Sequence, residues 1–343
     1  VIDKRNHIAG NIFDFVNDNN ELIHKYGPHL IHCRKDSKAL DFLSRFTEWI
    51  PYKHKVRALL SDNRTTPIPV NAQTIGDIFN KSFKNEDAVK TFLNKIRNEK
   101  IVPKNSDELF EFSVGNEIAN ILFRPYTKKM WGIDPKNLST SIGARIPVRT
   151  DFNDFYFNDE FQALPKFGYT EIIKKILSHE NINITLNTPF EKSMQNQYAH
   201  SFLCTPIDEY YEFVYGKLPY RSLKFFKKLE FDVNQESAVI NFTNNSKYTR
   251  KTQWSLFPNS GIPSSKLRTI TYELPCSIID NPGEYYYPIQ TKDSIGLYQK
   301  YLKLSKENKN VTFCGRTGLF KYIDMIPCVI IHLDLANKYL KNS

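Results

Sequence analysis

The order of secondary-structure patterns along the chain is the feature that most constrains its fold. The chain opens with a short apolar run that ends in an acid, Val1-Ile2-Asp3, and closes with a strand-like Val311–Cys314 followed by a helical pattern over Ile326–Leu340. A strand that ends in a carboxylate is typical of dinucleotide-binding βαβ units, where the acid accepts hydrogen bonds from ribose hydroxyls. We therefore predict an α/β chain whose Rossmann-like domain is assembled from discontinuous segments.

Hydrophobic periodicity divides the middle of the chain into helical and strand-like stretches. Apolar residues at helical spacing predict helices over residues 38–49, 170–178 and, in several pieces, 74–122. Residues 146–157 alternate in character. Short β-rich runs predict strands over residues 56–60, 66–70, 182–186, 201–204, 238–243, 267–273 and 285–289. We expect the helical stretch to form a bundle and the later strands to form an antiparallel sheet.

Composition excludes several classes of function. The 343 residues are 41% hydrophobic, which permits a sizeable core, and the net charge is +10. Lys and Arg never form a block longer than three residues, so a diphosphate ligand or a solvated basic face explains the charge better than nucleic acid. The longest apolar run, at residues 326–335, is too short to span a membrane. Five scattered cysteines fit reduced thiols in a cytoplasm, and the histidines and cysteines lack the spacing of a metal site.

A series of short motifs runs in order along almost the whole sequence. They are Arg5–Asn11, Tyr26–His32, Pro51–Val56, Tyr126–Gly132, Arg145–Arg149, Tyr156–Asp159, Pro206–Tyr211, Tyr220–Leu223, Tyr248–Arg250, Tyr286–Ile289, Gly315-Arg316 and Tyr322–Met325. Together these segments resemble those of the bacterial type of UDP-galactopyranose mutase.

This resemblance implies an isomerase that interconverts UDP-galactopyranose and UDP-galactofuranose. It implies a bound FAD that is active in its reduced form, kept reduced by an external reductant such as NAD(P)H, whose N5 atom attacks the anomeric carbon and displaces UDP. It also implies that UDP-galactose is the small-molecule partner, that the product serves galactofuranose-containing cell-surface glycans, and that the protein is a cytoplasmic homodimer without a membrane span.

The resemblance also assigns roles to individual residues. Arg145 and Arg250 would hold the diphosphate, since guanidinium groups bind phosphate oxygens bidentately, and His29 would lie beside the flavin. The substrate-binding residues would be His54, Tyr126, Trp131, Tyr156, Tyr287 and Tyr322. The FAD-binding residues would be Asp3, Arg5, Gly10, Asn11, Arg316, Asp324 and Met325.

From the residues alone, a purely structural role remains open for several of these positions. Trp131 fits core packing as well as stacking on a sugar, and His32 fits a hydrogen-bonded core histidine. We expect Tyr126 and Trp131 to lie in a loop-like stretch. Asp324 can cap a helix that begins near Met325, with or without a cofactor.

Three domains follow from the predicted elements and the resemblance. Residues 1–70, 165–215 and 300–343 would form the FAD-binding domain, residues 71–135 a helical domain with a mobile substrate loop, and residues 136–164 and 216–299 the antiparallel sheet domain. The glycine-rich strand–turn–helix expected before Asp3 is not in the sequence, so we expect weak FAD retention and marginal folding. Ala9 stands where the family usually has glycine, which adds a methyl group near the cofactor.

Two other functions remain open. The chain could be a flavoprotein of the amine-oxidase or protoporphyrinogen-oxidase type, which shares the discontinuous FAD fold. It could instead be an inactive remnant that at most binds UDP-sugars.

Overall fold

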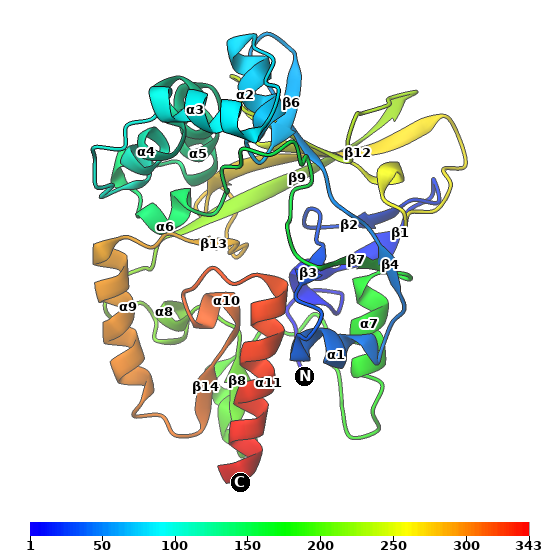
Figure 1. Ribbon diagram of the computed structural model, residues 1–343. Helices are drawn as coiled ribbons and strands as arrows, with labels where there is room; N and C mark the ends of the chain where they lie inside the picture. Colours follow the sequence, from blue (N-terminus) through cyan, green and yellow to red (C-terminus); the bar gives the residue numbers. More distant parts are fainter. Residues whose placement is uncertain (343) are drawn as a thin grey trace.

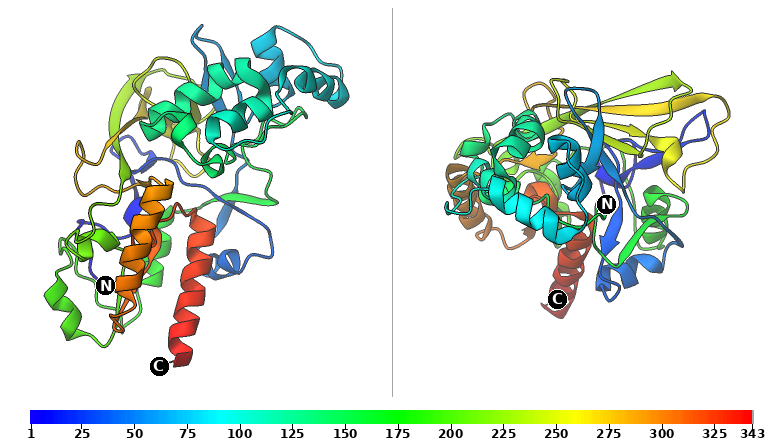
Figure 2. Two further views of the ribbon diagram at one scale, coloured as in Figure 1. Left: turned by 90° about the vertical axis from the view of Figure 1, so that its left-hand side faces the viewer. Right: turned by 45° about the horizontal axis from the view of Figure 1, so that its top comes forward.

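The computed structural model describes residues 1–342, arranged as a helical group, a large sheet and an α/β layer that follow one another along the molecule. In Figure 1 the helical group lies at the top left, the sheet crosses the middle, and both chain termini lie in the lower part. The left view of Figure 2 shows the helical group at the opposite end of the molecule from the C-terminal helix. The predicted site residues are distributed over all three regions.

The large sheet has seven strands in the order β13-β9-β12-β11-β10-β5-β6. Its longest pair, β9 and β12, is antiparallel with Ser277 opposite Arg221 at one end and Leu267 opposite Phe231 at the other. Strands β5 and β10 run parallel and join the first part of the chain to the later strands. The seven strands are β5 (Val56–Leu59), β6 (Thr65–Ile68), β9 (Tyr220–Phe231), β10 (Val239–Phe242), β11 (Arg250–Gln253), β12 (Leu267–Ser277) and β13 (Tyr287–Pro288).

The helical group covers one end of this sheet with its own apolar core. Its helices are α2 (Ala72–Phe79), α3 (Glu86–Ile96), α4 (Ser106–Ile118), the π-helical turn η2 (Ala119–Phe123), α5 (Arg124–Trp131) and α6 (Thr140–Gly143). The side chains of Asn71, Asn85 and Asn105 accept hydrogen bonds from the third backbone N–H of α2, α3 and α4. Such caps satisfy donors that a helix leaves free at its start.

The α/β layer contains three small sheets and the C-terminal helix. Strands β8 (Ser201–Leu203) and β14 (Val311–Phe313) pair in parallel, and β14 continues into α10 (Gly315–Gly318) and α11 (Met325–Asn342). A parallel bridge between Ile2 and Thr185 ties the first residues to this layer. The remaining elements are β1 (Asp14–Val16), β2 (Leu22–His24), β3 (Ile31–Cys33), α1 (Lys38–Ser44), β4 (Trp49–Pro51), β7 (Phe161–Pro165), α7 (Tyr169–Ile176), α8 (Ile207–Tyr210), α9 (Lys292–Ser305) and four 3₁₀ turns, Gly10–Ile12, Pro135–Asn137, Lys192–Gln197 and Trp254–Leu256.

Several predicted elements differ from the observed ones. The helix predicted for residues 38–49 ends at Ser44, and Trp49–Pro51 forms β4. Residues 146–157 form only isolated bridges, at Val148 and Phe155, and residues 182–186 form only one, at Thr185. Strands β5 and β6 pair within the large sheet, whereas we expected residues 56–70 in the N-terminal domain. Among the described residues, no helix is both long and apolar enough to cross a membrane.

Candidate active site

Arg250 is built into the large sheet. It is the first residue of β11, and its register partner on β12 is Glu273. The Arg250 Nη1 atom lies 3.6 Å from Glu273 Oε1, and the Glu273 side chain is only 4% exposed. Burial alone would lower the pKa of Arg250, but the Glu273 carboxylate and nearby tyrosines raise it well above its ordinary value. Arg250 is therefore a permanently charged group on a rigid strand.

The turn at Gly27 packs directly against Glu273. Gly27 has φ +85°, and a Cβ at this position would lie 2.9 Å from Glu273 Oε1. An L side chain rarely adopts this backbone conformation, so glycine is needed both for the turn and for the close approach. The Y-G-P motif thus places the 26–32 segment next to the Arg250 ion pair.

Arg145 comes from an irregular segment after α6. Its guanidinium carbon lies 3.7 Å from the centre of the Tyr322 ring, and the ring of Tyr322 stacks on that of Tyr287 at 5.6 Å. Arg145 is exposed to solvent. The Arg316 guanidinium also lies 4.5 Å from the Tyr322 ring centre. The two tyrosines therefore lie among positively charged groups.

Tyr156 links the two arginines. Burial raises the pKa of its phenol, and the charges of both Arg250 and Arg145 lower it in part. Tyr126 interacts electrostatically with Arg250 and with Tyr156. The structure therefore brings together six residues that the sequence predicted to be near each other: Tyr126, Arg145, Tyr156, Arg250, Tyr287 and Tyr322.

Trp131 differs from its predicted setting. It ends helix α5, so the expected loop-like stretch over Tyr126–Trp131 is wrong. Its side chain is 6% exposed and packs with Leu138 and Ile289, at 6.0 Å from the Tyr287 ring. The helix forms here because Pro125 lies in its first turn and Gly132 ends it in the left-handed conformation.

The histidines beside this cluster are neutral. Burial lowers the pKa of His29 and of His54 to about 3. The Nδ1 atom of His29 lies 2.8 Å from the Gly27 carbonyl oxygen, so Nδ1 carries the proton and Nε2 can accept a hydrogen bond. His32 instead hydrogen-bonds to Asp159 at 2.9 Å and stacks on Phe157, as expected for a satisfied structural histidine.

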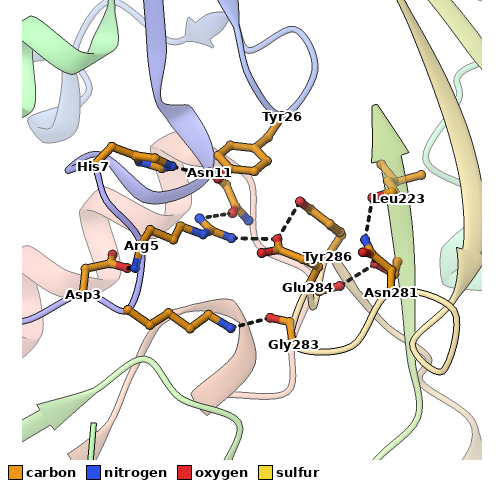
Figure 3. A network of polar contacts seen from close by, with 12 residues as sticks. Asp3, Arg5, His7, Asn11, Tyr26, Leu223, Asn281, Gly283, Glu284 and Tyr286 are labelled. Carbon is orange, nitrogen blue, oxygen red and sulfur yellow. Dashed lines mark hydrogen bonds and ion pairs between the residues drawn. The ribbon is translucent and has the colours of Figure 1, made fainter. Parts of the chain in front are cut away.

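The predicted cofactor residues near the N-terminus form a polar network with a segment that precedes β13 (Figure 3). Arg5 donates from Nη1 to Asn11 Oδ1 at 2.9 Å and from Nη2 to Glu284 Oε2 at 3.0 Å. The Asp3 carboxylate accepts the backbone N–H of Arg5 at 2.9 Å, and Tyr286 donates to Glu284 at 2.8 Å. The network brings Asp3, Arg5 and Asn11 together as predicted.

Ala9 and Gly10 form a left-handed turn at the edge of this network. Ala9 has φ +70° and Gly10 has φ +52°. A Cβ at Gly10 would meet nothing within 4 Å, so the backbone here is open to a ligand. The glycine usual at position 9 in the family fits this backbone conformation better than the alanine present.

The start of α11 forms the remaining part of the predicted cofactor site. The helix begins at Met325, and a pocket at this end is lined by Leu30, His32, Asp324, Met325, Ile326 and Pro327. The free N–H groups of a helix start favour negative charge. Arg316, however, donates to the carbonyls of Tyr286 and Ile323, at 3.0 and 2.8 Å.

Buried polar atoms without a hydrogen-bond partner, around Arg5 and around Arg250, indicate whether a ligand fits at these two places. Within the described residues, Arg5 Nε, Arg250 Nε and Glu273 Oε1 are buried without a hydrogen-bond partner. Buried polar atoms are nearly always paired in native proteins. The unpaired N–H groups of Arg5 and Arg250, together with the Asp3 carboxylate, the open Gly10 backbone and the α11 start, fit a polar cofactor bound beside a phosphorylated substrate, while Glu273 balances the charge of Arg250. No group of three or more His, Cys, Asp or Glu side chains within residues 1–342 is placed to hold a metal ion.

Comparisons with known proteins agree with this arrangement. A family model described as UDP-galactopyranose mutase matches residues 121–322, and one described as an NAD(P)-binding Rossmann-like domain matches residues 1–46. The chain belongs to the UDP-galactopyranose mutase family. It is 33% identical to a probable UDP-galactopyranose mutase of Klebsiella pneumoniae, over 100% of this chain and 88% of the relative. It is 30% identical to a dTDP-fucopyranose mutase of Escherichia coli, over 100% of this chain and 92% of that relative.

Solved structures support the fold. A crystal structure of reduced UDP-galactopyranose mutase matches with a TM-score of 0.74 at 16% identity, over 100% of this chain and 88% of that one. A putative protoporphyrinogen oxidase from Exiguobacterium matches with a TM-score of 0.62 at 11% identity, over 99% and 92%. The predicted mixture of a Rossmann-like domain, helices and an antiparallel sheet is thus confirmed. The enzyme class implied by the family is an isomerase.

Two acidic residues of the site, Glu273 and Glu284, were not predicted from the sequence. Glu273 is the lone acid of β12, and such a residue in a strand is a candidate for a buried ion pair. Glu284 follows Pro282-Gly283 in an apparently ordinary turn, and its partnership with Arg5, 279 residues away, leaves no local signal.

Proposed function

We propose that this protein interconverts UDP-galactopyranose and UDP-galactofuranose with the help of FAD. The single observation that carries the proposal is the convergence of Arg145 and Arg250 on a group of four tyrosines. Guanidinium groups and phenols suit the oxygens of a diphosphate. The family membership and the relatives' names support the choice of substrate.

FAD would be held by the N-terminal network and by the start of α11. Asp3 would accept from ribose hydroxyls, the Gly10 and Asn11 backbone would approach the cofactor, and Met325 would present a helix start to it. Kept reduced by a reductant such as NAD(P)H, FAD would supply an electron-rich N5 atom able to bond to the anomeric carbon of the sugar.

The chain's own residues would retain and orient UDP while its bond to the sugar is broken. Arg250 would bind the diphosphate from a fixed position on β11. Arg145 would bind the same diphosphate from the irregular segment after α6. Tyr126 would stack on uracil, while Tyr156, Tyr287 and Tyr322 would donate to phosphate oxygens. The neutral His29 would lie beside the flavin, its Nε2 atom able to accept a hydrogen bond.

A second candidate substrate is dTDP-fucopyranose. The relative from Escherichia coli that carries this name is almost as similar in identity as the mutase of Klebsiella pneumoniae. Both substrates present a nucleoside diphosphate to the same arginines, so the choice depends on contacts to the base and the sugar. An oxidase function has less support, since the protoporphyrinogen oxidase shares the fold only.

The test is turnover by the purified protein, loaded with FAD and reduced with dithionite. We expect UDP-galactofuranose to be converted to UDP-galactopyranose, with dTDP-fucofuranose converted more slowly and no conversion by the oxidised protein. Faster conversion of the dTDP-sugar would assign the second candidate. Conversion of neither sugar by FAD-loaded protein would favour an inactive remnant and contradict the proposal.

The setting in the cell is also part of the proposal. All five cysteines are free, which suits a reducing cytoplasm. We propose a homodimer there that supplies galactofuranose units for cell-surface glycans. Sedimentation of the purified protein at a dimer mass would support the first point, and a monomer would contradict it.

A further inference from the structure

Two cysteines meet at the ends of neighbouring parallel strands. Phe313 of β14 is in register with Leu203 of β8, and the next residue on each strand is a cysteine, Cys314 and Cys204. The Cys314 backbone N–H donates to the Leu203 carbonyl at 2.9 Å. The two sulfur atoms are 3.6 Å apart, so the thiols are in direct contact.

The two thiols have different surroundings. Cys204 is exposed, whereas Cys314 is only 5% exposed. The hydrogen bond from the Cys314 thiol lowers the pKa of Cys204 to about 7, and the same contact raises the pKa of Cys314. Because Cys204 is the more exposed residue of the pair and has the lowered pKa, it is the thiol expected to attack an oxidant, and the covered Cys314 is the resolving thiol.

The structure also restricts which cysteine can act as the resolving thiol. Cys328 lies on α11, and its sulfur contacts His332 Nδ1 at 3.6 Å. His332 Nε2 accepts the Gly315 N–H at 2.9 Å, which holds this ring between α11 and the strand end. Cys314 is thus the partner that directly touches Cys204.

We propose that Cys204 and Cys314 form an oxidation site that a peroxide converts to a disulfide. The Cys204 thiolate attacks one peroxide oxygen, breaks the O–O bond and becomes a sulfenic acid, with release of water or, from an organic peroxide, an alcohol. The Cys314 sulfur then attacks the Cys204 sulfur and expels the sulfenic oxygen as water. Two thiols are oxidised by two electrons, and one peroxide is reduced.

The strand geometry permits this bond. Neighbouring strands lie about 4.8 Å apart, which is within the Cα separation that disulfides need. The two sulfur atoms, 3.6 Å apart, would have to approach to about 2.05 Å to form the bond. The bond would form against Gly315, where a Cβ would already lie 3.0 Å from Cys204 Sγ. It would therefore fix the turn from which Arg316 reaches the Tyr322 ring.

The test counts thiols after a short treatment of the intact protein with a small excess of hydrogen peroxide. We expect the five free thiols to fall to three after denaturation, and the intact mass to fall by two hydrogens. A peptide map should join the segments that contain Cys204 and Cys314, and dithiothreitol should reverse the change.

Single variants separate the two roles. Cys314→Ser should stop at a sulfenic acid on Cys204 that dimedone traps, and Cys204→Ser should leave position 314 reduced. Cys276→Ser, on the large sheet, is the matched control and should still lose two thiols. Five remaining thiols, a bond from Cys204 to Cys328, or over-oxidation of Cys204 without a bond would each overturn the proposal. Because no readout requires turnover, this test is independent of the proposed mutase function.

Discussion

The two arginines of the site differ in how the fold holds them. Arg250 lies in the middle of the seven-stranded sheet, opposite a buried carboxylate, and 27% of its side chain is exposed. Arg145 lies outside any helix or strand, and its partners are side chains: it lies over the ring of Tyr322 and interacts electrostatically with Asp324, Tyr287 and Tyr156. Arg250 is therefore held by a strand of the sheet, whereas Arg145 is held by side-chain contacts.

Backbone anchoring explains this difference. Around Arg250, the N–H of Thr249 donates to the Glu273 carbonyl at 2.9 Å and the β11 ladder continues on both sides. Around Arg145, the N–H of Ala144 donates to the Thr140 carbonyl at 2.9 Å and the N–H of Arg149 donates to the Val70 carbonyl at 2.8 Å, but Arg145 lies between them outside any strand ladder. We infer that Arg250 is in place before substrate arrives and that Arg145 adjusts to it. The following predictions test this contrast.

The largest expected effect is on turnover. Arg250→Ala and Arg145→Ala should each lower kcat/KM by about 10²–10³-fold, since each removes a charged donor from the diphosphate. Arg250→Lys should recover little activity because the planar fork is lost, whereas Arg145→Lys should recover more if that segment adjusts. Steady-state kinetics with UDP-galactofuranose measures kcat/KM for these variants. Equal recovery of activity by Arg250→Lys and Arg145→Lys would show that the two arginines do not differ in how the fold holds them.

The second expected effect is on stability. Removing one partner of a buried ion pair leaves the other unpaired, so Glu273→Ala should lower the free energy of unfolding by about 3 kcal/mol. Arg145→Ala should change it by no more than about 0.5 kcal/mol. Urea unfolding measures both, and Glu236→Gln, at a largely exposed carboxylate, is the control. Similar losses for Glu273→Ala and Arg145→Ala would show that the two regions are equally fixed.

The third prediction concerns pH. Burial, with a smaller contribution from the charge of Arg250, lowers the pKa of His54 to about 3. The unfolded chain therefore binds a proton that the folded chain does not between pH 6.5 and 3. Stability should fall across this range as the pH falls, by up to about 1.4 kcal/mol per pH unit for this group. His54→Gln should make the unfolding free energy less dependent on pH there, and an unchanged slope would count against a buried neutral His54.

The smallest effect concerns the contact that holds Arg145. Tyr322→Phe keeps the ring under the guanidinium, and Tyr322→Ala removes it. A cation–π contact at such a site contributes about 0.5–1 kcal/mol, so the alanine variant should raise KM about 2–5-fold beyond the phenylalanine variant. Kinetics of the two variants provides the measurement. No difference between them would mean that another contact positions Arg145.

The motifs predicted much of the site but not the scaffold that supports it. Ordered matches identified the arginines and tyrosines, and the structure brings them together. Strand β9 was not predicted, because Lys224–Glu230 mixes lysines with apolar residues and its pairing with β12 spans a distant part of the chain. The alternating stretch over 146–157 includes Pro147 and pairs with the rest of the chain only through the isolated bridges of Val148 to Val70 and of Phe155 to Lys55. Long-range pairs such as Arg5 with Glu284 leave no periodic signal.

The most direct measurement of the central claim is calorimetric titration of the protein with UDP and with uridine. If Arg145 and Arg250 hold the diphosphate, UDP should bind at least about 100-fold more tightly than uridine, because each charged hydrogen bond contributes about 1.5–3 kcal/mol. Arg250→Ala and Arg145→Ala should then weaken UDP binding and leave uridine binding unchanged. Equal affinity for UDP and uridine in the wild-type protein would contradict the account.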